Sequence, residues 1–276
     1  MTFKKWLKTP KSRVMIVMLA FLLIASLMER NGHGLINGAI AIMTAVLIDV
    51  VFYTFQKRKQ ILPDGSVITG LIIALILGTT TSFLVMIGTV AIAILSKHIV
   101  SYKKKPIFNP AAFGLFISVL VFKSQQSWWG AFGDLPWWTL IFILIGGYMI
   151  TSRVNKYPQV FSFLGTYISL FFLLSLLHIG DTFDALRPPF INATMFFGFF
   201  MLTDPPTSPG KPKNQVIFGV LSAIIGTAIY ARYGGLIYLF IGLFVGNLYE
   251  LLDRTIQSKR RSNQKKPKAT RSKSVV

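Results

Sequence analysis

The stretch LINGAIAIMTAVLIDVVFYTF, residues 35–55, decides the class of fold. It contains one charged residue, Asp49, and it is long enough to cross a bilayer, which takes about 20 mainly apolar residues. Comparable apolar runs recur along the chain, separated by charges, Pro/Gly clusters and polar turns. We therefore predict an all-α, polytopic membrane protein of about ten transmembrane helices. Their expected positions are 14–28, 35–55, 66–78, 81–97, 109–123, 136–152, 159–179, 189–203, 214–231 and 234–252.

The composition supports a membrane environment. Of the 276 residues, 53% are hydrophobic and 14% are charged, whereas soluble domains average about 25% charged residues. The chain has no cysteine, which excludes disulfides, cysteine nucleophiles and cysteine-ligated iron–sulfur clusters. The three histidines have no metal-ligand spacing, so we expect no metal site.

Basic residues are distributed unevenly between the two sides of this topology. All but four of the 29 Lys and Arg residues lie in the two tails and in alternate loops; the exceptions are Arg30, Lys123, Arg187 and Arg232. Lys and Arg are retained on the cytoplasmic side during insertion. We therefore predict an integral plasma-membrane protein with both termini in the cytoplasm.

The chain divides into three parts in this interpretation. Residues 1–13 form a basic cytoplasmic tail, residues 14–254 the transmembrane domain, and residues 255–276 a basic, disordered tail. The net charge of +20 is concentrated on the cytoplasmic side, where it favours contact with anionic lipid headgroups. The C-terminal tail has no interleaved aromatic residues, so nucleic acid is not an expected partner.

Four polar stretches interrupt the apolar sequence. They are Leu62–Ser66 (LPDGS), Phe108–Gly114 (FNPAAFG), Thr203–Pro209 (TDPPTSP) and Tyr233–Gly235 (YGG). Each has an ordinary interpretation as a turn or a helix cap. The spans beside the first three are short, however, and short spans are typical of broken helices that line a cavity.

Taken together, these motifs resemble the NqrB/RnfD family of membrane proteins. It comprises the RnfD component of the Rnf electron-transport complex and the NqrB component of the sodium-pumping NADH:quinone reductase. The resemblance rests on LPDGSVITGLIIAL (62–75), IFNPAAFGLF (107–116), TMFFGFFMLTDPPTS (194–208) and NLYELLD (247–253). It implies a ten-helix component of a redox-driven sodium or proton pump, with further subunits as partners and a flavin mononucleotide bound through a threonine.

The sequence departs from that family at the flavin attachment site. The family's S-G-A-T motif does not occur, and the corresponding loop, residues 123–136, contains no threonine. The stretch most similar to this motif is Asn192-Ala193-Thr194, and Thr194 is the one candidate for holding the cofactor. Flavin mononucleotide is therefore a candidate cofactor by resemblance, and covalent attachment is not supported by the sequence.

A weak internal similarity also stands out. Pro106-Ile107-Phe108-Asn109 and Pro189-Phe190-Ile191-Asn192 both precede a span with small residues and a Phe-Gly pair. The two spans are three apart and enter from opposite sides, as an inverted repeat requires. Chance similarity explains the pattern equally well.

Polar residues inside or at the ends of spans are the candidate ion or ligand path, because such groups are costly in a bilayer. The candidates are Asp49, Asp64, Asn109, Asn192, Thr203 and Asp204. Asp49 has an alternative role in pairing with the nearby Lys57–Lys59 cluster. Glu250 and Asp253 lie beside Arg254 and are expected to make ordinary pairs at a helix end.

Two functions are favoured by the sequence, and a membrane scaffold with no transported substrate remains open as a third. The first is a membrane subunit of a redox-coupled sodium or proton pump, which is at most one part of an enzyme. The second is a stand-alone transporter or channel for a small solute, built on the same helices without a redox role. The missing flavin motif favours the second, and the resemblance favours the first.

Overall fold

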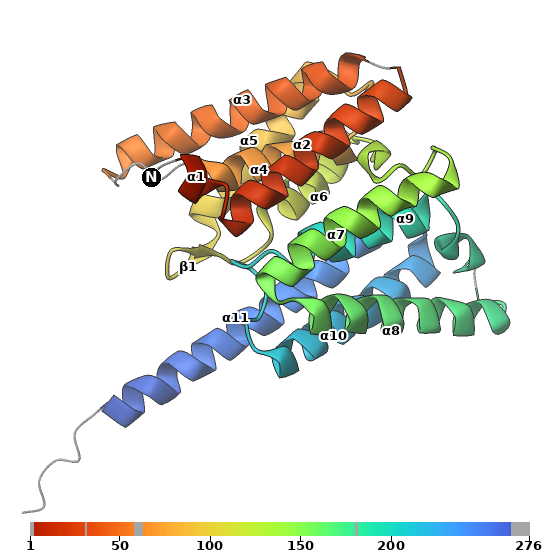
Figure 1. Cartoon of the computed structure of the whole chain (residues 1–276). Coiled ribbons are helices and arrows are strands. Elements are labelled where there is room, and N and C mark those ends of the chain that lie inside the picture. Colours follow the sequence, from red (N-terminus) through yellow and green to blue (C-terminus); the bar gives the residue numbers. More distant parts are fainter. Residues whose placement is uncertain (1–2, 31, 58–62, 180–181, 266–276) are drawn as a thin grey trace, which may run out of the picture.

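The computed structural model describes residues 3–30, 32–57, 63–179 and 182–265. Its first half contains five apolar helices and a short hairpin, which gather on one side of Figure 1. The elements are α1 (Phe3–Trp6), α2 (Pro10–Met28), α3 (Gly32–Phe55), α4 (Asp64–Ile76), α5 (Phe83–Ile99), β1 (Ser101–Tyr102), β2 (Lys105–Pro106) and α6 (Pro110–Phe122).

The second half packs against the first as a separate layer (Figure 1). Its elements are η1 (Trp129–Ala131), η2 (Trp137–Thr139), α7 (Leu140–Val154), α8 (Tyr157–Leu176), η3 (Thr182–Leu186), α9 (Phe190–Phe196), η4 (Phe197–Met201), α10 (Pro212–Tyr233) and α11 (Ile237–Lys265). Local sequence explains several helix starts. Thr9 and Asn109 cap α2 and α6 with their side chains, and a proline follows each cap, as is common in the first helical turn.

The predicted all-α membrane fold is confirmed. Each of the ten predicted spans falls on a helical segment of the described residues. Among those residues, five segments are long and apolar enough to cross a membrane unaided, and four shorter ones are also apolar. The outward faces carry large apolar side chains; Leu27, Phe55 and Leu84 are 74%, 83% and 82% exposed. Such a surface is stable in lipid and not in water.

Helix lengths show where the bundle is interrupted. At about 1.5 Å per residue, the 13 residues of α4 span roughly 20 Å of a hydrocarbon core about 30 Å thick. The continuous helix formed by α9 and η4 is of similar length. Both are followed by polar loops, residues 77–82 after α4 and 202–211 after η4.

The two halves repeat the same order of elements. Helices α2 to α6 correspond to α7 to α11, with α4 matching the interrupted α9–η4. Equivalent contacts recur: a Cβ on Gly114 of α6 would lie 2.8 Å from the backbone oxygen of Thr89 in α5, and a Cβ on Gly242 of α11 would overlap the backbone oxygen of Ser222 in α10. If each half crosses the membrane five times, the two copies have opposite orientations, as in an inverted repeat.

The sequence similarity between residues 106–109 and 189–192 does not correspond to this structural repeat. That similarity pairs the segment before α6 with the segment before α9, whereas the order of elements pairs α4 with α9. It therefore reflects two similar helix starts at Asn109 and Asn192.

Helix α11 differs from the predicted domain limits. It continues to Lys265, past residue 254, where we expected a disordered tail to begin. Residues 266–276 of that tail lie outside the described part of the chain.

Candidate functional site: the polar loop that ends the interrupted helix

The segment α9–η4 ends in an irregular turn. The Leu202 N–H donates to the Phe197 oxygen five residues earlier, at 2.9 Å, so this last turn is π-helical. The Thr203 hydroxyl donates to the Phe199 oxygen at 2.6 Å. Single π-helical turns are rare and occur frequently at functional sites.

The following loop is held together by hydroxyl groups. Thr207 Oγ1 donates to Asp204 Oδ2 at 2.9 Å, and Ser208 Oγ donates to the Asp204 backbone oxygen at 2.7 Å. Burial raises the pKa of Asp204, against the opposing effects of the Thr207 hydrogen bond and of the cations Lys11, Lys156 and Arg254. The loop therefore presents a partly buried carboxyl group whose affinity for a proton is higher than that of an exposed aspartate.

Two buried asparagines join this loop to both halves of the molecule. Asn109 donates through Nδ2 to the Met201 oxygen at 3.2 Å. Asn247 of α11 accepts the Asn109 backbone N–H at 3.1 Å and donates to the Thr207 oxygen at 3.0 Å. Since both side chains are at most 3% exposed, their bonds satisfy backbone groups that water does not reach.

A buried lysine lies on the far side of the loop. Lys156, between α7 and α8, is 4% exposed. Its ammonium donates to Ser208 Oγ at 2.9 Å and also to the Pro209 oxygen. Burial lowers the Lys156 pKa to about 8, although the charges of Glu250 and Asp204 oppose that shift.

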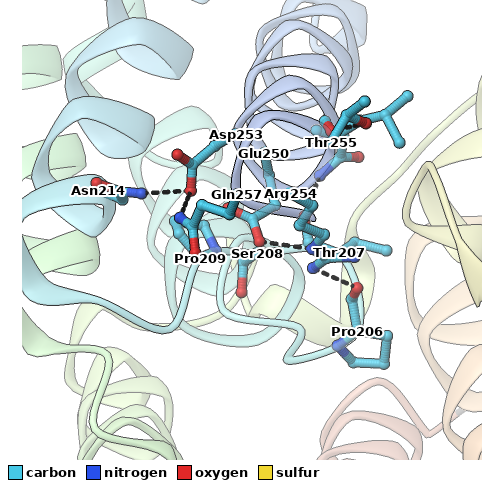
Figure 2. Close-up of polar contacts among 12 residues, drawn as sticks. Pro206, Thr207, Ser208, Pro209, Asn214, Glu250, Asp253, Arg254, Thr255 and Gln257 are labelled. Atoms are coloured by element: carbon cyan, nitrogen blue, oxygen red, sulfur yellow. Dashed lines mark hydrogen bonds and ion pairs between the residues drawn. The ribbon is translucent and has the colours of Figure 1, made fainter. Parts of the chain in front are cut away.

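Helix α11 adds an acid–base network beside the loop (Figure 2). Arg254 donates to Glu250 Oε1 at 2.6 Å and to the Pro206 oxygen at 2.7 Å. Asp253 Oδ2 accepts from Asn214 at 2.7 Å and from Gln257 at 2.5 Å. The expected pairing of Glu250 with Arg254 is therefore present, and it also holds the loop.

Three buried oxygens around this loop have no hydrogen-bond partner among the described residues. They are Gln159 Oε1, Gln215 Oε1 and Glu250 Oε2. The amide nitrogens of the two glutamines donate to Leu202 and Gly210 at the two ends of the loop. Unpartnered buried acceptors are costly unless they meet water or an ion.

Asp49 lies apart from this loop. Its carboxylate is 1% exposed and bonds to Lys97 Nζ at 2.9 Å and to His98 Nε2 at 2.8 Å. Lys97 also donates to Ser66 Oγ of α4 at 2.9 Å. The partners of Asp49 are thus on α5, whereas the sequence suggested the Lys57–Lys59 cluster, of which only Lys57 is described.

Two further predicted residues are also outside the loop. Asp64, in the first turn of α4, accepts a hydrogen bond from the Trp6 indole at 3.2 Å. Asn192 in α9 donates to the Ala131 and Phe132 oxygens at 3.1 and 3.3 Å. Of the six predicted path residues, the structure brings together Asn109, Thr203 and Asp204.

The surroundings of Thr194 do not fit an attached flavin. Its side chain is fully buried, and its hydroxyl lies 3.0 Å from the Tyr238 hydroxyl, which in turn lies 2.8 Å from that of Tyr167. A phosphoester at Thr194 would need space that these rings occupy. Within the described residues, there is also no group of three or more His, Asp or Glu residues placed to hold a metal.

Sequence reasoning missed Lys156, Gln159, Gln215 and Asn247 as parts of this site. Lys156 was counted only as one cation of a cytoplasmic loop. A glutamine near the start of an apolar span, as at 159 and 215, was the available signal, because an uncharged polar group there needs a buried partner.

Fold and site together define a class: a polytopic, all-α membrane protein with an internal repeat and a partly buried polar loop at an interrupted helix. The chain belongs to the NQR2, RnfD, RnfE family, whose profile matches residues 5–136 and 130–259. The two matches coincide closely with the two structural halves.

Curated relatives are similar over part of the chain. The D subunit of the ion-translocating oxidoreductase complex of Mannheimia succiniciproducens is 34% identical over 96 residues, which cover 35% of this chain and 27% of that protein. The proteins of the same name from Vibrio vulnificus strain YJ016 and Shewanella amazonensis are 32% identical over 101 residues and 30% identical over 113 residues. These matches cover 36% and 38% of this chain and 28% and 30% of those relatives. The matched region thus spans less than a third of the length of these relatives.

Proposed function

We propose that the chain is a membrane subunit of a redox-coupled ion-translocating complex, and that the 202–211 loop forms part of its ion path. The observation that carries this proposal is the set of unpartnered buried oxygens of Gln159, Gln215 and Glu250 around that loop. Hard cations such as sodium bind oxygen ligands, and a proton path needs groups that accept and donate protons in a buried setting.

The charges at the loop suit a path for a cation. Asp204 and Glu250 supply two acidic groups that act electrostatically on Lys156. Burial raises the pKa of Asp204, so this group takes up a proton more readily than an exposed aspartate does. A sodium ion or proton at either acidic group would be repelled by the Lys156 ammonium. This repulsion would limit how tightly the ion is held, which a path requires and a storage site does not.

The redox part of the proposal rests on family membership and on the names of the relatives. We infer that other subunits of the complex supply the electron carriers. A flavin mononucleotide would then bind noncovalently in this chain or belong to a partner, since Thr194 is enclosed by Tyr238 and Tyr167.

The charge asymmetry supports cytoplasmic N- and C-termini, because 25 of the 29 basic residues then lie inside. The 202–211 loop would face the cytoplasmic half of the membrane. The basic tails would lie against anionic headgroups.

A stand-alone transporter for a small solute is the second candidate. The observation that favours it is the missing flavin-attachment motif together with the enclosed Thr194. An inverted repeat with interrupted helices serves solute transport as readily as ion pumping.

One experiment separates the two. The full-length tagged chain is extracted from its native membranes, and its absorbance from 350 to 500 nm is recorded before and after acid denaturation. A redox subunit is expected to carry flavin itself or to co-purify with proteins that contain flavin and iron–sulfur clusters. Inverted vesicles should then take up sodium or protons when a reductant is added. A colourless preparation with reductant-independent transport would instead support the solute transporter.

A further inference from the structure

The hairpin between α5 and α6 has an unusual turn. Ser101 pairs with Pro106 and Tyr102 pairs with Lys105 in an antiparallel ladder. The two residues between the strands, Lys103 and Lys104, have φ angles of 50° and 66°. Two successive positive φ values are the pattern of a type I′ turn, for which Asn-Gly is strongly preferred. Lysines are unfavourable at both positions, and such strain often marks a functional site.

The strained turn forms one wall of a cavity. This cavity has a volume of about 330 Å³ and is about half open to its surroundings. The other wall is formed by Arg254, Gln257 and Ser258 of α11. The cavity is lined by Tyr102, Lys103, Lys105, Arg254, Gln257 and Ser258.

The lining is positively charged and has several hydrogen-bond donors. None of its six residues is acidic. Glu250 compensates Arg254 through the 2.6 Å ion pair. Lys103 donates to Ser258 Oγ and lies 5.3 Å from the centre of the Tyr102 ring, contacts that leave its charge uncompensated. The two hairpin lysines therefore bring excess positive charge to the cavity.

We propose that this cavity binds a phosphate-bearing anion, either the headgroup of an anionic phospholipid or a soluble phosphate compound. A phosphate oxygen accepts readily from lysine ammonium and arginine guanidinium groups, which make short, charge-assisted hydrogen bonds. Ser258 and Gln257 add neutral donors. Basic pockets at the cytoplasmic ends of transmembrane helices are suited to lipid headgroups.

The cavity is connected to the polar loop through Arg254. The guanidinium that lines the cavity also donates to the Pro206 oxygen of the 202–211 loop at 2.7 Å. A bound phosphate would contact the same side chain, so occupancy of the cavity would add to the interactions that hold the loop in place.

The test uses the full-length protein and two probes at constant ionic strength. The first probe is a phosphatidylcholine nanodisc with and without phosphatidylglycerol, followed by native mass spectrometry of retained lipid. The second is inorganic phosphate, titrated by calorimetry in detergent. The variant Lys103→Gln/Lys105→Gln removes two charges from the cavity. The control Lys259→Gln/Arg260→Gln removes two charges further along α11, outside the cavity lining.

We expect the cavity variant to weaken binding at least tenfold and the control to change it less than twofold. Retention of phosphatidylglycerol alone would identify a lipid headgroup as the ligand, and binding of phosphate alone a soluble one. Equal losses in both variants, or no saturable binding of either probe, would overturn the proposal.

A second variant separates binding from folding. Lys103→Asn/Lys104→Gly introduces the sequence that a type I′ turn prefers. It should raise the melting temperature and at the same time weaken binding. A higher melting temperature with unchanged binding would contradict a ligand-binding role for the turn.

Discussion

The substitution Asn247→Leu tests the asparagine bridge directly. Asn247 is 1% exposed, and its side chain satisfies the Asn109 N–H and the Thr207 oxygen. Leucine keeps the branching of asparagine at Cγ, but its methyl groups neither donate nor accept, so both hydrogen bonds are lost. Each buried backbone group left unsatisfied costs about 1–3 kcal/mol, which gives a total of about 2–6 kcal/mol.

Thermal unfolding in detergent, followed by tryptophan fluorescence, measures this loss. For a domain of this size, 1 kcal/mol corresponds to about 2–4 °C, so the melting temperature should fall by roughly 5–20 °C. Asn214→Leu is the matched control, because Asn214 and its partner Asp253 are only partly buried and water can replace their bond. A fall below 2 °C for Asn247→Leu, or equal falls for both variants, would refute the bridging role.

Three further predictions concern packing, ionisation and topology. Gly242→Ala should destabilise the protein by about 1–3 kcal/mol, because its Cβ would overlap the Ser222 backbone oxygen. Gly165→Ala meets no atom within 4 Å and lies within α8, so it should not lower stability in the same melting assay. Since the folded-state pKa of Lys156 is lowered to about 8, the unfolded state binds more protons between pH 8 and about 10.5. Stability should therefore rise across that window relative to Lys156→Met, and parallel stability–pH curves would contradict the shift. The cysteine-free chain allows single-cysteine labelling in intact cells with an impermeant maleimide: Lys123→Cys should react and Lys104→Cys should not, and the reverse would invert the topology.

The sequence predicted the positions of the spans well, because apolar run length and the Lys and Arg pattern are local properties. It also marked Asn109, Thr203 and Asp204, which lie at helix ends where the chain must break. The partners of these residues were not predictable in this way. Asn247 is 138 positions from Asn109, and only tertiary packing brings their α11 and α6 segments together.

The partners of Asp49 were missed for the same reason, because tertiary packing brings them together. Asp49 was matched with cations near it in sequence, but α5 places Lys97 and His98 closer in space. The four tryptophans between residues 128 and 138 are divided between the interior and the surface, and Trp137 and Trp138 are 85% and 47% exposed. In the structure, Trp128 and Trp129 are 1% and 3% exposed, because η1 folds back onto the end of α4 and the Trp129 indole donates to the Ala74 oxygen at 2.8 Å.

The most direct test of the proposed ion path is redox-driven sodium and proton uptake by inverted membrane vesicles that contain Asp204→Asn. The variant keeps an oxygen acceptor for the Thr207 hydroxyl but cannot take up or release a proton at this position. The matched control is Asp184→Asn, since Asp184 is 57% exposed and pairs only loosely with Arg187. A path through the loop predicts that ion uptake falls at least tenfold in Asp204→Asn with the complex still assembled, and that Asp184→Asn retains full uptake. Undiminished uptake by an assembled Asp204→Asn complex would contradict it.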